Sequence, residues 1–202
     1  MHKLNFKKFG LLWLKEKKYI NSILTSDTFK KKLLKLMVSR SLWLINLSGL
    51  FKDNSEYIYG IINELGLKPE SLSAVYVNLS RKPSRTYIWA NDSGNRAIFV
   101  KILDPIEFYD VTDEIRTQKI ISKNIPNINT FEIIEHGLLD NGSAFLVYES
   151  LDMALLSLRR QISDEEISRY FEELKILHPD FNSENIFAIK DSYYVVDFEA
   201  IK

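Results

Sequence analysis

The spacing of hydrophobic residues divides the chain into a helical first part and a strand-rich second part. Between residues 27 and 47, apolar residues recur at helical spacing with lysines between them, which predicts a basic amphipathic helix. A shorter helix is predicted over 6–23. A third follows Asn54 and stops near Gly66, the residue type that commonly ends a helix. Residues 1–70 are therefore predicted to be mostly helical.

Beyond residue 70 the chain consists of short segments that are rich in β-branched and aromatic residues and are separated by turn sequences. They predict three strands, a helix and two further strands, at 73–79, 85–90, 96–103, 111–123, 131–137 and 144–149. A capped helix from Ser163 to Leu177 follows, and a hairpin of strands 186–189 and 193–196 ends the pattern. The fold class is therefore predicted to be α+β, with a five-stranded sheet followed by a smaller unit.

Composition and charge limit the class of protein. The chain has 202 residues, 46% of them hydrophobic and 27% charged, and can bury one sizeable core or two small ones. It contains no cysteine, which excludes disulfides and thiolate metal sites and fits a reducing cytoplasm. The net charge of zero hides an asymmetry, since residues 1–52 carry +10 and the remainder −10. Lys35 and Arg40 interrupt the most apolar stretch, 33–51, so we expect no spanning helix there.

The last predicted hairpin places two oxygen-bearing side chains near each other. With residues 190–192 as its turn, Asn185 and Asp197 lie equally far from the centre. That register makes them a cross-strand pair, and an amide oxygen beside a carboxylate suits Mg²⁺. Asp180 lies five residues before Asn185, in a loop that follows a helix, and can place a third oxygen at the same point.

Several segments resemble motifs of the protein-kinase-like superfamily, in the order that the family has them. The run 178–185 matches H-x-D-x-x-x-x-N, the catalytic loop, and 195–199 resembles the metal-binding D-F-G segment. The strand 97–101 resembles V-A-I-K, and 113–116 resembles the start of the helix whose glutamate pairs with that lysine. The segment 145–151 resembles the hinge that meets adenine through its backbone.

The resemblance implies an ATP- and magnesium-dependent kinase. Asp180 would position or deprotonate the acceptor hydroxyl. Asn185 and Asp197 would hold Mg²⁺ on the triphosphate. Lys101, oriented by Glu114, would neutralise phosphate charge, so that catalysis would consist mostly of placement and electrostatics.

Details of the motifs resemble the aminoglycoside, choline and lipopolysaccharide-sugar kinases more than the protein kinases proper. Pro179 stands where protein kinases have an arginine, and Glu199 replaces the glycine of D-F-G. Glu149 lies in the hinge-like segment and is a candidate nucleotide-binding residue. The turn 80–84 contains no glycine, so Lys82 or the neighbouring serine hydroxyls would take the place of a glycine-rich phosphate loop.

The resemblance predicts a two-lobe kinase-like fold. A basic helical segment (1–70) precedes an N-lobe with a five-stranded sheet (71–150) and a shortened C-lobe (151–202), since only five residues follow Asp197. Three functions stay open. The first is a phosphotransferase acting on a hydroxyl of a small molecule or glycan, such as a lipid-linked sugar. The second is a nucleotide-binding pseudokinase with a regulatory or scaffolding role, and the third is a minimal self-phosphorylating protein kinase.

The basic residues of 1–52 have two competing interpretations. Their helices can pack on the chain's own core with the lysines in solvent, or they can dock on an anionic membrane surface, where each basic residue adds about 1 kcal/mol. The protein is expected in the cytoplasm, and the second interpretation places it at the inner membrane face as a peripheral protein. Nucleic-acid binding is not favoured because the segment lacks interleaved exposed aromatics and a groove-reading motif. Zinc is not expected, since the three histidines have no paired spacing.

Overall fold

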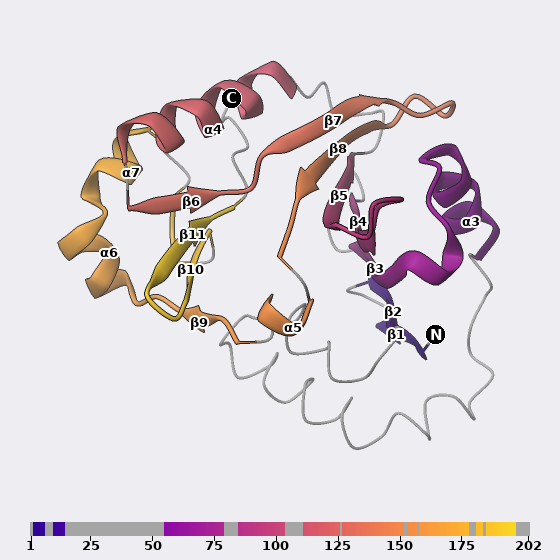
Figure 1. The fold of residues 1–202 in the computed structure, drawn as a ribbon, viewed down its shortest axis with the longest axis horizontal. Coiled ribbons are helices and arrows are strands. Elements are labelled where there is room, and N and C mark those ends of the chain that lie inside the picture. The colour runs from indigo at the N-terminus through magenta and orange to yellow at the C-terminus, as the bar shows by residue number, and fades with distance from the viewer. Residues whose placement is uncertain are drawn as a thin grey trace.

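The computed structural model describes residues 2–6, 10–14, 55–78, 85–103, 111–125, 127–151, 153–156, 158–177, 181–183 and 185–196. Within these ranges the fold is α+β, with two β-sheets and short helices around them (Figure 1). The predicted basic helix at 27–47 lies outside the described residues. The fold class is therefore confirmed at the level of α+β.

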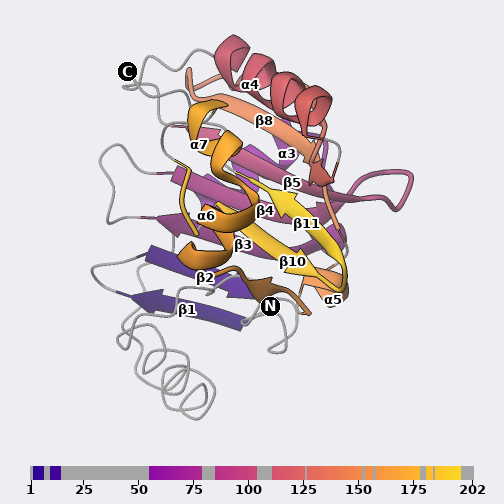
Figure 2. The ribbon, with the colours of Figure 1, turned by 90° about the vertical axis from the view of Figure 1, so that its left-hand side faces the viewer.

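The larger sheet has seven strands. They are β1 (His2–Phe6), β2 (Gly10–Leu14), β3 (Leu72–Asn78), β4 (Arg85–Asn91), β5 (Ala97–Leu103), β7 (Ile133–Leu138) and β8 (Ala144–Glu149). Their spatial order is β1-β2-β3-β4-β5-β8-β7, and every neighbouring pair is antiparallel (Figure 2). The five predicted strands of this region are all present, with ends within two residues of the prediction.

The N-terminal residues add two strands where a helix was predicted. β1 and β2 form a hairpin, and β2 pairs with β3, with Leu11 opposite Val77. The helix predicted over 6–23 is therefore wrong at Gly10–Leu14. An apolar run this short has no period that separates a helix from a strand. Pairing with β3 also satisfies backbone groups at what would otherwise be an open sheet edge.

One face of the larger sheet, the helix face, forms the main core with α3 (Ser55–Glu64). Direct cross-strand partners lie on the same face, so Val75, Ile88, Val100 and Val147 form a continuous buried row across four strands. Three isoleucines of α3 belong to the same cluster: Ile58, Ile61 and Ile62. Gly66, with φ of +64°, follows the helix as predicted.

The smaller sheet has four strands, in the order β6-β11-β10-β9. They are β6 (Ile128–Thr130), β9 (Arg160–Gln161), β10 (Ile186–Ile189) and β11 (Ser192–Val195), and only β6 and β11 are parallel among these described pairs. Three helices lie against it: α4 (Val111–Asn124), α6 (Asp164–Tyr170) and α7 (Glu172–Leu177). The short α5 (Met153–Leu156) and the 3-10 turn η2 (Pro69–Ser71) complete the described elements. Strands β6 and β9 were not predicted, because two or three residues carry too little pattern.

The helix predicted from Ser163 to Leu177 is divided in two. Ser163 caps α6 as predicted, since its hydroxyl accepts a hydrogen bond from the Glu166 N–H and the Glu166 carboxylate accepts one from the Ser163 N–H. Phe171 then leaves helical geometry with φ of −135°, and α7 begins at the next residue. The Phe171 side chain is buried in the core of the smaller sheet.

The two sheets turn their remaining faces toward each other. In Figure 1, α3 covers the outer side of the larger sheet, while α6 and α7 lie beyond the smaller sheet. Phe131, which directly follows β6, packs against a cluster of the larger sheet formed by Leu103, Leu146 and Tyr148. We call these mutually facing surfaces the inner faces of the two sheets.

Candidate functional site

The inner face of the larger sheet carries aromatic and ionisable side chains. The rings of Tyr76, Tyr87, Phe99 and Tyr148 form a row across β3, β4, β5 and β8, with neighbouring ring centroids 6.1, 5.9 and 5.7 Å apart. Lys101 lies on the same face, since it is the direct cross-strand partner of Tyr87. Burial raises the pKa of the Tyr76 hydroxyl, which keeps that ring neutral.

Lys101 forms a buried ion pair with Glu114 in the first turn of α4. The Nζ atom lies 3.5 Å from Glu114 Oε2, and the two side chains are 3% and 0% exposed. The hydroxyl of Tyr148 donates a hydrogen bond to the other carboxylate oxygen, Oε1. The predicted pairing of Glu114 with Lys101 is therefore confirmed, and each carboxylate oxygen has a different partner.

The ion pair is difficult to explain by stability alone. Taking two charges out of water costs several kcal/mol per ion, and apolar residues of similar volume often stabilise a fold as well or better. The N-terminal end of α4 favours a negative charge, but that contribution is only about 0.3–1 kcal/mol at an exposed site and about 2 at best. Buried titratable pairs of this kind gather at functional sites, so Lys101 and Glu114 mark the best candidate in the described residues.

The position of Glu114 depends on how α4 is held. Gln118 follows one turn later on the same side of the helix, and its amide nitrogen donates to the backbone carbonyl of Phe131. Ile121 is fully buried in the core of the smaller sheet. α4 is therefore anchored on the smaller sheet while it supplies the carboxylate that meets Lys101 on the larger one.

The turn between β10 and β11 is one residue shorter than predicted. Ile189 pairs directly with Ser192, which leaves Lys190 and Asp191 as a two-residue turn. Lys190 has φ of +54°, the left-handed backbone conformation that lets a two-residue turn match the twist of its strands. The sequence Lys-Asp gives no Asn-Gly signal for such a turn, which is why a three-residue turn was expected.

This register changes the neighbour of Asn185. The Val196 N–H donates to the Asn185 carbonyl at 2.8 Å, so Asn185 lies opposite Val196 and the predicted cross-strand pair with Asp197 is wrong by one residue. The Asn185 side-chain oxygen accepts from the Asn182 N–H at 3.1 Å, and the Asn182 carbonyl accepts from the Asn185 N–H at 3.0 Å. These bonds orient the amide. An amide oxygen has two lone pairs, so Oδ1 can take a second partner.

Of the remaining predicted site residues, only Glu149 lies in the part of the chain that the structure describes. Asp180, Asp197 and Lys82 lie outside the described residues. Glu149 ends β8 with an exposed side chain, and its N–H donates to the Glu132 carbonyl at 2.8 Å. This backbone donor of the hinge-like segment is therefore used within the sheet.

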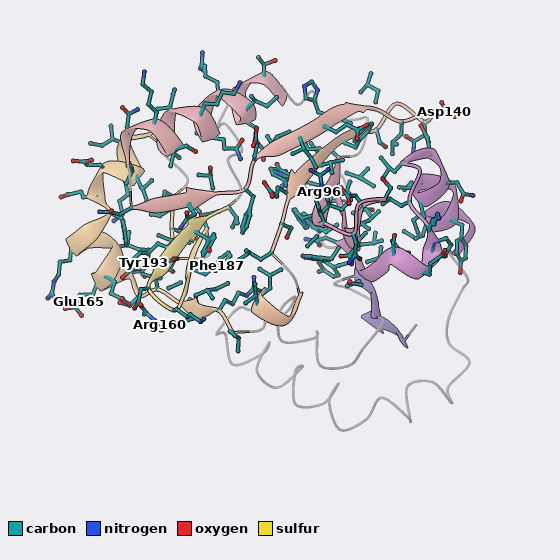
Figure 3. The ribbon with its side chains drawn as sticks, in the orientation of Figure 1. Arg96, Asp140, Arg160, Glu165, Phe187 and Tyr193 are labelled. Carbon is teal, nitrogen blue, oxygen red and sulfur yellow. The ribbon has the colours of Figure 1, made fainter. Side chains whose placement is uncertain are left out.

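The inner face of the smaller sheet is aromatic as well and includes a partly buried arginine. Phe187 stacks on Tyr194 at 5.5 Å, Phe131 stacks on Tyr194 at the same distance, and the Arg159 guanidinium lies 5.6 Å from the Phe187 ring centroid. Burial lowers the pKa of Arg159 to about 10, so the group stays protonated at neutral pH. Figure 3 places Phe187 on the side of the sheet nearer the larger sheet and Tyr193 nearer α6 and α7.

Sequence reasoning missed Tyr148 and Arg159. Tyr148 lies two residues after Leu146 in β8, so the two side chains point to the same face of the sheet. Only the pairing of Leu146 with Lys101 shows that this is the inner face. Arg159 precedes a two-residue strand that has no pattern of its own. A signal for either residue would require the strand register, which a single sequence does not contain.

No family model, curated protein or solved structure matches this chain. Within the described ranges, no group of three or more His, Cys, Asp or Glu side chains is placed to hold a metal ion. None of the helices in those ranges is long and apolar enough to cross a membrane.

Proposed function

We propose that this protein is an ATP- and magnesium-dependent phosphotransferase that transfers a phosphoryl group to a hydroxyl of a small molecule or glycan. The observation that carries the proposal is the buried ion pair between Lys101 and Glu114, which links β5 to α4. The kinase-like motifs select this same lysine and glutamate from the sequence as a pair. The proposal includes a kinase-like arrangement in which the larger and smaller sheets form the cores of two lobes.

In this proposal Lys101 supplies a fixed positive charge for the nucleotide phosphates. A lysine held in a nearly water-free site interacts with a phosphate more strongly than one in solvent, because the local dielectric constant is lower. Glu114 supports that role by favouring the charged ammonium and by limiting where it can lie. The lysine is thus placed before the nucleotide arrives, and little reorganisation is needed.

The acidic residues of the catalytic-loop motif complete the proposed chemistry. Asp180 would accept the proton of the acceptor hydroxyl or orient it. Asn185 and Asp197 would hold Mg²⁺, which supplies charge neutralisation on the triphosphate. The Asn182–Asn185 bond that orients the Asn185 amide supports its part of this assignment. The part of Asp197 rests on the motif, since the register that first suggested the pair does not hold.

The test uses the purified full chain, a panel of hydroxyl acceptors and a coupled assay for magnesium-dependent ATP consumption. Lipid-linked sugars in anionic vesicles belong in the panel because residues 1–52 carry a charge of +10. Asp180→Ala should slow transfer on the order of 10²- to 10⁴-fold with ATP binding nearly unchanged. Lys101→Met should weaken ATP binding itself, whereas Lys190→Met, at an exposed turn, should change neither.

Binding of ATP is measured separately by its effect on the melting temperature. At a concentration of about 100 times Kd, ATP should stabilise the folded protein by about 2.7 kcal/mol. Absence of both this stabilisation and of ATP consumption refutes the proposal. If ATP raises the melting temperature but is not consumed, and Asp180→Ala changes neither result, the protein is instead a nucleotide-binding pseudokinase.

A further inference from the structure

Tyr148 contributes a buried hydroxyl to the ion pair that carries the proposed function. Its side chain is 5% exposed, and the hydroxyl donates to Glu114 Oε1 on the carboxylate whose Oε2 faces Lys101. The three side chains come from three different elements: β8, α4 and β5. None of the kinase-like motifs assigns a role to this hydroxyl.

The position of the Tyr148 ring is fixed by the sheet. Tyr148 lies between its cross-strand partners Phe99 on β5 and Ile133 on β7, and its ring centroid is 5.7 Å from that of Phe99. Both neighbours pack in the same hydrophobic cluster. A phenol held on two sides presents its hydroxyl at one place, which makes it a suitable anchor for a mobile group.

Glu114 is the group that needs an anchor. The last torsion of a glutamate side chain is broad and has no single preferred value, so a carboxylate with one partner can rotate. A hydrogen bond from a fixed hydroxyl to Oε1, beside the ion pair that Lys101 makes with Oε2, gives each oxygen its own partner. Hydrogen bonds to a charged carboxylate are among the stronger ones in proteins, especially at a site with no exposure to water.

We propose that Tyr148 is a positioning residue that acts through Glu114 to fix the Lys101 ammonium where the nucleotide phosphates are bound. This inference rests on the proposed function. The competing explanation is structural: the hydrogen bond would only fasten α4 to the larger sheet. A purely structural bond would change the melting temperature on removal but would leave the chemical behaviour of Lys101 and the ATP affinity of the folded protein unchanged.

The test removes the hydroxyl and keeps the ring with Tyr148→Phe, so that packing against Phe99 is retained. Tyr193→Phe is the matched control, because it is a partly buried tyrosine on the side of the smaller sheet that faces α6 and α7 (Figure 3). Two quantities are measured on folded protein: Kd for MgATP, and the rate of Lys101 reductive methylation followed by peptide mass spectrometry. Tyr148→Phe should raise both about tenfold, and Tyr193→Phe should change both by less than about twofold.

A double-mutant cycle identifies the route through Glu114. In a Glu114→Gln background the charged acceptor is already gone, so adding Tyr148→Phe should change Kd and methylation rate by less than about twofold. Equal effects of Tyr148→Phe in both backgrounds overturn the positioning role. Unchanged Kd and methylation in the single variant overturn it as well, whatever happens to the melting temperature.

The two readouts separate this inference from the proposed function. If the wild-type protein binds no ATP, the proposed function fails, and the methylation rate alone then decides whether Tyr148 positions the Lys101 amine. Faster methylation that disappears in the Glu114→Gln background supports the positioning role. Unchanged methylation refutes it. If ATP binds and both quantities rise together, both proposals are supported.

Discussion

Removing the charge of Lys101 alone should destabilise the protein far more than removing the whole ion pair. Lys101→Met keeps most of the side-chain volume but removes the positive charge that lies 3.5 Å from the carboxylate of Glu114, a side chain with 0% exposure. A buried carboxylate in that position takes up a proton instead of staying charged. Protonating a glutamate at neutral pH costs about 3–4 kcal/mol, given its ordinary titration near pH 4.3.

That cost sets the expected size of the effect. A loss of about 3–4 kcal/mol lies within the range observed when one partner of a buried ion pair is removed. For a chain of this length, each kcal/mol lowers Tm by about 2–4 °C, so the variant should melt about 6–16 °C below the wild type. The cost of protonation falls with pH, so the difference should shrink as the pH is lowered toward about 4.

Glu114→Gln is the matched compensating change. The amide has the size of the carboxylate and still accepts the hydrogen bond of the Tyr148 hydroxyl, but it carries no charge. The double variant Lys101→Met with Glu114→Gln should therefore recover about 2–3 kcal/mol of the loss. Urea unfolding of the two single variants, the double variant and the wild type at neutral pH measures the coupling.

Two results would contradict this reasoning. If Lys101→Met lowers the unfolding free energy by less than about 1 kcal/mol, the carboxylate is not confined to a dry site. If the two substitutions are additive, the side chains do not act as a pair. In either case the ion pair would no longer support the proposed function.

Other predictions concern the fold around the site. Ser163→Ala removes the α6 cap and should lower the unfolding free energy by about 1 kcal/mol in urea unfolding. Hydrogen bonds from the Arg96 backbone and guanidinium lower the pKa of Asp92, so the charged carboxylate stabilises the fold at neutral pH. This stabilisation is lost as the pH falls through the lowered pKa. Asp92→Asn should therefore be less stable than the wild type only above that pH, which melting curves at several pH values measure. Ile88→Ala, at a fully buried position, should cost about 2–5 kcal/mol, whereas Ile176→Ala, 78% exposed, should change stability by less than about 0.5 kcal/mol in the same assay.

Local pattern was sufficient for most elements of the described chain. Strands such as Ala144–Glu149 and Ile186–Ile189 were predicted to the residue, because turn-forming residues bound a run of β-branched and aromatic side chains on each side. The contact between Lys101 and Glu114 was predicted too, but by a different route. It came from the resemblance of two motifs, since nothing local relates residues on a strand and a later helix.

Strand register and long-range strand pairing could not be predicted from the sequence. The turn at Lys190 adopts a positive φ that lysine only rarely takes, and this one residue moves Val196 to the place expected for Asp197. Gly10–Leu14 forms a strand because it pairs with the edge of β3, which lies more than fifty residues later in the chain. Tyr148 reaches Glu114 only through the combined placement of β8 and α4.

The way α4 is held connects the proposed chemistry to the relation between the two sheets. Gln118 and Ile121 fasten the helix to the strands and core of the smaller sheet, yet Glu114 on the same helix meets Lys101 and Tyr148 on the larger one. A shift of the smaller sheet relative to the larger would therefore withdraw the carboxylate from the lysine. If nucleotide phosphates favour the paired arrangement, they also favour one placement of the sheets, because the coupling between two linked equilibria is reciprocal. Nucleotide binding should then stabilise this placement of the two sheets, and this placement should in turn strengthen nucleotide binding.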